Sequence, residues 1–98
     1  MPNSTLPREV LDLNITASLP EPLVIEMIQL IEEFIPSMIP GHRYLLETMC
    51  GNAFWDKRLK PSQRTQAGST MAKMVSGGLF DLNFAATYHG VTKMYQLK

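Results

Sequence analysis

Gly77 and Gly78 separate two segments with different hydrophobic periodicities, and this change limits the possible folds more than any other feature. Before the glycines, apolar residues recur as on one side of a helix, at Ala67, Met71, Met74 and Val75. After them, apolar residues alternate as in strands, at Phe80, Leu82, Phe84, Tyr95 and Leu97. Since glycine can end a helix by adopting a positive φ, the pattern predicts a helix over 63–76 followed by two strands.

The residues that flank these elements fit the same interpretation. Pro61 disfavours helix at Lys60, and Ser62 is a good N-cap for the helix that follows. Between the strands, segment 87–90 is a turn candidate because Gly90 can adopt a positive φ. We therefore expect the chain to end in a β-hairpin.

Further helical segments are expected before Pro61. Residues 21–38 form an amphipathic pattern, with glutamates on much of the polar side. The apolar residues of this helix cover more than a narrow core-facing stripe, so the helix could pair two copies of the chain. The candidate dimerisation residues are Leu23, Met27, Ile31 and Phe34. A short helix over 42–50 and one or two helical turns over 53–59 follow, without a signal for a strand between helices.

These elements predict an α+β fold. It consists of a three-helix core with a C-terminal β-hairpin, preceded by the amphipathic acidic helix 21–38. Residues 1–20 show no sustained period and are expected to form a partly ordered arm, whereas 21–98 form one domain. A chain of 98 residues, 45% of them hydrophobic, can build one modest core but not two.

The charges are unevenly distributed along the chain. From Met1 to Gly41, one basic residue stands against six acidic ones, a net charge of −5. From His42 to Lys98, eight basic residues stand against three acidic ones, a net charge of +5. The overall balance points to no class of partner, but the C-terminal part alone is cationic.

From His42 to Lys98 the order of elements resembles the winged helix-turn-helix superfamily of DNA-binding proteins. The resemblance lies in the architecture and in the stretch Ser62–Leu82, where a polar helix runs through Val75-Ser76-Gly77-Gly78-Leu79 into the first hairpin strand. It implies a winged-helix-like domain that binds double-stranded DNA, as in small bacterial or phage transcription regulators. In such proteins the polar helix reads the DNA and the hairpin is the wing.

The residue types on this helix suit DNA because a helix enters the major groove only if its outer face lacks bulky apolar groups and offers hydrogen-bond donors. The candidate DNA-binding residues of the helix are Ser62, Gln63, Arg64, Gln66, Ser69, Thr70 and Lys73. Candidate phosphate contacts beside it are Lys57, Arg58, Lys60, His89 and Lys93. So few phosphate contacts give weak binding from one copy, which favours a homodimer through helix 21–38.

An alternative function needs no nucleic acid. A face of serine, threonine, glutamine and lysine is also typical of an ordinary solvated surface. The acidic first helix and the wing would then bind another protein, as an adaptor or an inhibitor does.

Neither catalysis nor cofactor binding is predicted. Cys50 has no histidine near it in sequence, and the chain contains neither zinc-ligand spacing nor a phosphate-binding loop, so we expect no enzyme, metal or cofactor. Nothing in the sequence indicates a small-molecule substrate. The N-terminal residues do not resemble a signal peptide, and stretch 23–39 is too charged to span a bilayer, so a cytoplasmic protein without membrane contact is expected.

Overall fold

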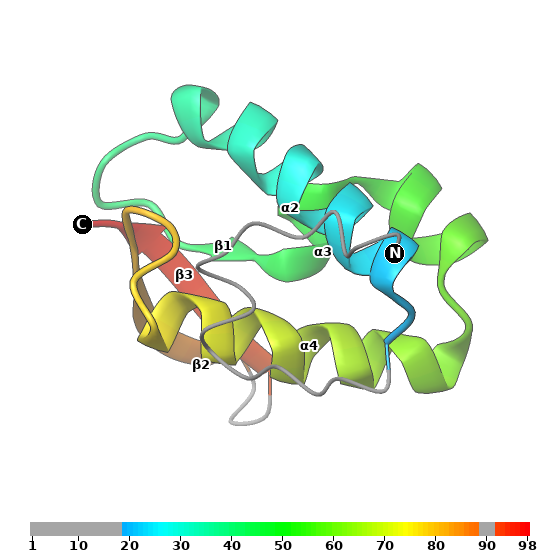
Figure 1. Ribbon diagram of the computed structural model, residues 1–98. Helices are drawn as coiled ribbons and strands as arrows, with labels where there is room; N and C mark the ends of the chain where they lie inside the picture. The colour runs from blue at the N-terminus through cyan, green and yellow to red at the C-terminus, as the bar shows by residue number, and fades with distance from the viewer. Residues whose placement is uncertain (1–18, 89–91) are drawn as a thin grey trace, which may run out of the picture.

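The computed structural model describes residues 19–88 and 92–98, which form helices packed on a small antiparallel sheet (Figure 1). The fold is therefore α+β, as predicted. In chain order, its elements are α2 (Glu21–Phe34), the 3-10 turn η1 (Ile35–Ser37), β1 (Tyr44–Leu45), α3 (Leu46–Cys50), the π-helical turn η2 (Ala53–Arg58), α4 (Pro61–Ser76), β2 (Leu82–Tyr88) and β3 (Thr92–Leu97). The arm predicted over 1–20 lies almost wholly outside the described residues.

Helix α2 ends earlier than predicted, at Phe34 rather than at residue 38. Pro36 has no amide hydrogen to continue the helical bonding, and its ring crowds the preceding turn. The chain tightens into η1 and leaves it at Met38, whose amide donates to the Ile35 carbonyl at 3.0 Å.

The prediction of one helix over 42–50 is wrong in its first half. Tyr44 and Leu45 form β1 and pair with Tyr95 and Met94 of β3, and α3 begins only at Leu46. The Tyr44 ring packs edge-on against Phe34 with centroids 5.3 Å apart, and its hydroxyl accepts the Ile39 amide at 3.0 Å. These contacts reach across the fold, so a local helical pattern could not reveal them.

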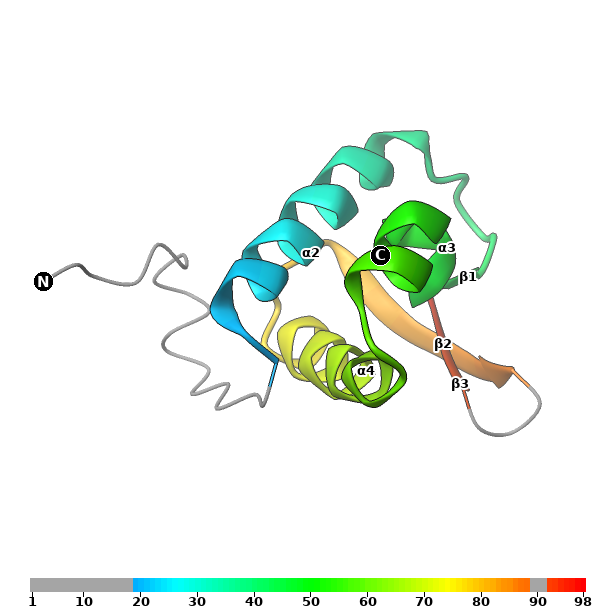
Figure 2. The same ribbon diagram turned by 90° about the vertical axis from the view of Figure 1, so that its right-hand side faces the viewer.

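The sheet has the order β1-β3-β2, with β3 in the middle. Beyond the two residues of β1, strands β2 and β3 continue as a hairpin that extends past the helices (Figure 2). The turn predicted over 87–90 is only partly described: strand β2 runs to Tyr88, and residues 89–91 lie outside the described part. An irregularity between Phe84 and Ala86 interrupts the register.

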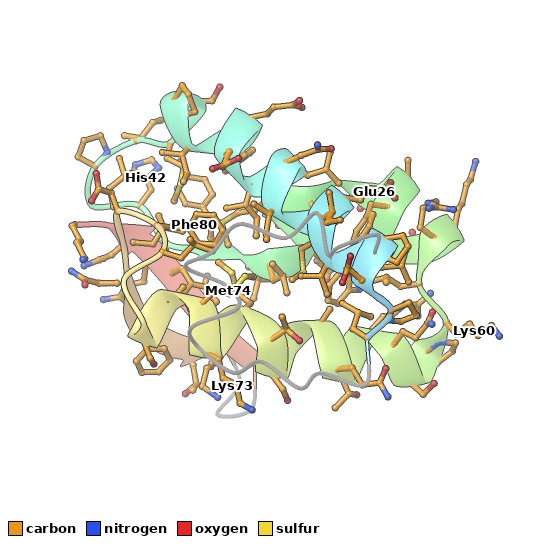
Figure 3. All side chains as sticks on the ribbon, viewed as in Figure 1. Glu26, His42, Lys60, Lys73, Met74 and Phe80 are labelled. Carbon is orange, nitrogen blue, oxygen red and sulfur yellow. The ribbon has the colours of Figure 1, made fainter. Side chains whose placement is uncertain are left out.

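One hydrophobic core joins all the layers. Its fully buried side chains come from α2, α4 and β2 and include Met27, Ile31, Met71, Met74 and Leu82. In Figure 3, Met74 and Phe80 are directed into this core. Helix α2 is thus part of the main core and does not merely precede it.

The packing of α2 determines whether the residues predicted to form a dimer interface are accessible. Leu23, Met27 and Ile31 are buried inside the single chain, and Phe34 is half-buried against Tyr44. These side chains are therefore covered by the chain itself and offer little surface to a second copy. Among the described helices, none is long and apolar enough to cross a membrane.

We predict that Ile31→Ala lowers the free energy of unfolding by about 2–5 kcal/mol, because it removes a fully buried side chain and leaves a cavity. Exposed Gln29 lies two positions earlier on the same helix, and Gln29→Ala is the matched control with little effect. Urea denaturation at two protein concentrations measures both variants. A loss that appears only in the more dilute sample would place Ile31 in an interface instead of the core.

Candidate functional site

Helix α4 carries most of the predicted site residues, and its start differs from the prediction. The N-cap is Lys60 and Pro61 is the first helical residue, so Ser62 lies inside the helix, where it is exposed. Gln63 supplies the cap: its Oε1 accepts the Lys60 amide at 2.9 Å. Proline suits the first turn because no amide partner is needed there. The Gln63 side chain is therefore engaged at the helix end.

The outer face of α4 is polar and uncharged except for one lysine. Ser62, Thr65, Ser69 and Lys73 are exposed, and Gln66 is half-buried at the margin. Lys73 points away from the body of the molecule, whereas its neighbour Met74 points inward (Figure 3). The amphipathic division of this helix thus agrees with the sequence pattern.

Thr70 does not belong to this face, which corrects the prediction. Its side chain is 1% exposed, and its hydroxyl donates to the Gln66 carbonyl at 2.8 Å. A threonine can satisfy its hydroxyl on the preceding helical turn, so it enters a core position that the helical wheel places at the margin. Thr70 is consequently unavailable to an external partner.

Both arginines of the predicted site make contacts within the chain. Arg64 is half-buried, and its Nε donates to the Trp55 carbonyl at 3.0 Å, while Nη2 lies 3.9 Å from Asp56 Oδ1. Arg58 holds Glu26 of α2 through Nε and Nη2 at 3.0 and 2.9 Å. The hydrogen bonds and charge of Glu26 raise the pKa of Arg58. Arg58 thus joins η2 to α2.

The predicted lysines are placed differently from these arginines. Lys57, Lys60, Lys73 and Lys93 are all exposed, and within the described residues their ammonium groups form no ion pair. Lys93 stands on β3 opposite Thr87 of β2. His89 lies outside the described residues. Among the described residues, the exposed cations of the candidate site that form no ion pair are therefore lysines on η2, before and on α4, and on the hairpin.

Few carboxylates accompany these cations. From Lys57 to Lys98, Asp81 is the single acidic side chain against seven lysines and arginines, which gives a net charge of +6. Neither α4 nor the segment 82–97 contains Asp or Glu. Exposed Glu32 and Glu33 lie instead on α2. The charge asymmetry of the sequence therefore becomes a partial separation. Helix α4 and the hairpin strands lack carboxylates, but Asp56 lies 3.9 Å from Arg64 and Glu47 lines the same hollow as Lys93.

A hollow of about 370 Å³ lies between α4 and the hairpin, and it was not predicted from the sequence. Its lining residues are Leu46, Glu47, Trp55, Arg64, Thr65, Gly68, Ser69, Thr92, Lys93 and Tyr95. Four elements meet there, so periodicity within any one of them could not predict the hollow. Gly68, a glycine inside a helix, is a sequence signal that could have indicated an open place on α4.

No protein-family model matches the chain, and no curated protein or solved structure matches it either. Within the described residues, no three metal-ligating side chains come together. The geometry and charge of the surface are therefore the basis for any functional argument.

The reactivity of Cys50 can be predicted from its burial. Its side chain is buried at the end of α3, and burial raises the pKa of the thiol to about 12 from 9.0. We predict that iodoacetamide labels Cys50 slowly in the native protein at pH 8 and rapidly in urea, because the thiolate is the reactive form. Mass spectrometry of the alkylated chain measures both rates.

The raised pKa of Cys50 also contributes to the pH dependence of the free energy of unfolding. A thiol whose pKa is higher in the folded chain stabilises the fold below the unfolded pKa, and this contribution is lost as pH rises from about 9 to about 12. Cys50→Ser is the control that abolishes labelling. Native labelling as fast as that of unfolded protein would show that the thiol is accessible.

Proposed function

We propose that this chain binds double-stranded DNA through the outer face of α4 and the β2–β3 hairpin. The observation that carries the proposal is the absence of carboxylates from both elements, next to exposed lysines on η2, α4 and β3. A surface that meets a polyanion gains from each cation and loses from each carboxylate, so this separation of charge favours DNA.

The arrangement of elements supports a winged-helix domain. Such domains have a strand after their first helix, and here β1 follows α2 and pairs with β3. Helix α2 then takes the place of the first helix, α3 and η2 that of the second, α4 that of the recognition helix and β2–β3 that of the wing. We propose on this basis a small transcription regulator of the bacterial or phage type, acting in the cytoplasm.

The proposed contacts with DNA are assigned to side chains that are exposed or half-buried. The small residues Ser62, Thr65 and Ser69 let α4 approach the floor of the major groove, which is about 12 Å wide. Gln66 and Lys73 on the same face offer donors to base edges or phosphates. Lys57 and Lys60 precede α4 and reach phosphates on one flank, and Lys93 of the wing reaches those on the other.

The number of exposed lysines limits the strength of the proposed binding to DNA. Four exposed lysines that each neutralise a phosphate give a slope of about −3.6 in log K against log salt, at about 0.9 per contact. Affinity from one copy is therefore modest and falls steeply with ionic strength. A short duplex at low salt is the appropriate substrate for the first measurement.

We predict that Lys73→Glu weakens binding to a short duplex at low salt and lowers the salt slope by about one, because it replaces a phosphate contact with a repelling charge. The matched control is Arg43→Glu, which changes the charge equally. Arg43 is exposed and follows His42, which lies far from Lys73 in Figure 3. Fluorescence anisotropy over a salt series measures both variants.

Equal losses in the two variants would mean that only total charge matters and that α4 is not the interface. If the wild-type chain fails to bind duplex DNA even at low salt, the proposed function is wrong. Circular dichroism shows whether each variant keeps the helical content of the wild type.

A second candidate, a protein-interaction module, is favoured by one observation. Phe84 is 51% exposed on β2, and β2 is an outer strand of the sheet. An outer strand with an exposed aromatic side chain can add a strand from another protein. Phe84→Ser would then abolish capture of that partner without changing DNA affinity, whereas Lys73→Glu would do the reverse.

A further inference from the structure

The hollow beside α4 has walls from distant parts of the chain. Leu46 and Glu47 come from α3, Trp55 from η2, Gly68 from α4 and Tyr95 from β3. Its volume of about 370 Å³ falls in the range of about 300–1,000 Å³ that small-molecule sites occupy. The hollow is thus large enough for an organic molecule of one or two rings.

The lining combines apolar surface with a few charges. Leu46 and Tyr95 are buried and Trp55 is half-buried, so apolar and aromatic side chains form part of the lining. At the walls, Arg64 and Lys93 bring two positive charges and Glu47 one negative charge, a net charge of +1. Such a combination is typical of sites in which apolar contacts hold a ring and a few polar groups orient it.

Arg64 is held in a fixed position toward the hollow. Its Nε is used by the Trp55 carbonyl, and Nη2 lies 3.9 Å from Asp56, which is itself exposed. A guanidinium has five N–H donors in a fixed plane, so these contacts leave donors free for an anion. The hydrogen bond ties Arg64 to the backbone of Trp55, and both residues line the hollow.

A glycine at position 68, inside α4, also points to a ligand, because packing within the fold does not require it. Glycine inside a helix is less favourable than alanine. A Cβ at Gly68 would meet no atom within 4 Å, so no neighbour in the described chain needs the space. Because Gly68 lines the hollow, the missing side chain keeps that wall of α4 open to an external group.

A DNA strand explains this surface less well than a small molecule does. Phosphates and sugars are polar and gain nothing from an apolar aromatic floor, whereas the exposed outer face of α4 serves them directly. A planar organic anion uses the whole lining: its ring meets Trp55 and Leu46, and its charged group meets Arg64 and Lys93.

We propose that the hollow between α4 and β3 binds a planar aromatic carboxylate, and that this ligand excludes DNA from the same side of the molecule. The exclusion rests on the proposed function, because Ser69, Thr65 and Lys93 belong both to the lining and to the DNA surface. Binding of the carboxylate in the hollow does not depend on the proposed function. A bound aromatic anion also reduces the positive charge that attracts phosphates.

The test uses 2-naphthoate as the probe and the full chain labelled with ¹⁵N. Trp55 is the one tryptophan of the sequence, so its indole N–H gives a single signal that reports on the hollow. We expect this signal to shift saturably with 2-naphthoate, and uncharged 2-naphthamide to bind at least about tenfold more weakly. Lys93→Gln should weaken 2-naphthoate to a similar extent, because it removes a cation at the wall.

Gly68→Leu is the decisive variant. Its Cβ would meet no atom within 4 Å, its side chain extends from the wall of the hollow, and leucine is a better helix former than glycine. The fold and its melting temperature should therefore be kept while 2-naphthoate binding is lost. Lys73→Gln is the matched control, since Lys73 is an exposed lysine of α4 outside the lining, and it should bind the probe as the wild type does.

The outcomes separate the site from the proposed function. No saturable shift up to about 10 mM probe, or equal binding by Gly68→Leu, overturns the ligand site even if the chain binds DNA. Binding of 2-naphthoate by a chain that does not bind DNA keeps the site and removes the regulation. If the chain binds both at once without mutual weakening, the proposed exclusion is wrong.

Discussion

Burial of one face of α4 is the constraint on which the rest of this structure depends. Ala67, Met71 and Met74 lose all contact with solvent in a core shared with α2 and the sheet. Burial of each of the two methionines contributes about 1.5–3 kcal/mol of transfer free energy, so the helix has one favourable rotation about its axis. That rotation directs Thr65, Ser69 and Lys73 outward and Gly68 toward the hairpin. The candidate surfaces are thus consequences of core packing.

Within the candidate site, arginines and lysines differ in what they contact, and the chemistry of the two side chains explains the difference. Arginine has a planar group with several fixed donors, which suits the double contact of Arg58 with Glu26 and the backbone contact of Arg64 with Trp55. Lysine carries a compact, strongly hydrated charge on a flexible stem, and the lysines of α4 and β3 are exposed. The charge available to a partner is therefore smaller than a count of basic residues implies.

Features encoded within one segment could be predicted from sequence, and features made between segments could not. The core face of α4, its end at the glycines and the pairing of the last two strands follow from local periodicity. Strand β1 was missed because two residues carry no periodicity and Tyr44 depends on Tyr95, fifty-one positions away by residue number. Burial of Thr70 and the hollow at Gly68 likewise depend on neighbours from other elements.

The position of α2 limits how the proposed binding to DNA could be strengthened by a second copy of the chain. Under the proposed function, four exposed lysines give weak binding to DNA, so a useful site on DNA would need either a second copy or a second source of affinity. The apolar face of α2 cannot join two copies while Met27 and Ile31 are fully buried in the chain's own core. Of the large apolar side chains in the described residues, Ile39 and Phe84 remain exposed, at 52% and 51%. Any second source of affinity therefore has to come from a part of the surface other than the apolar face of α2.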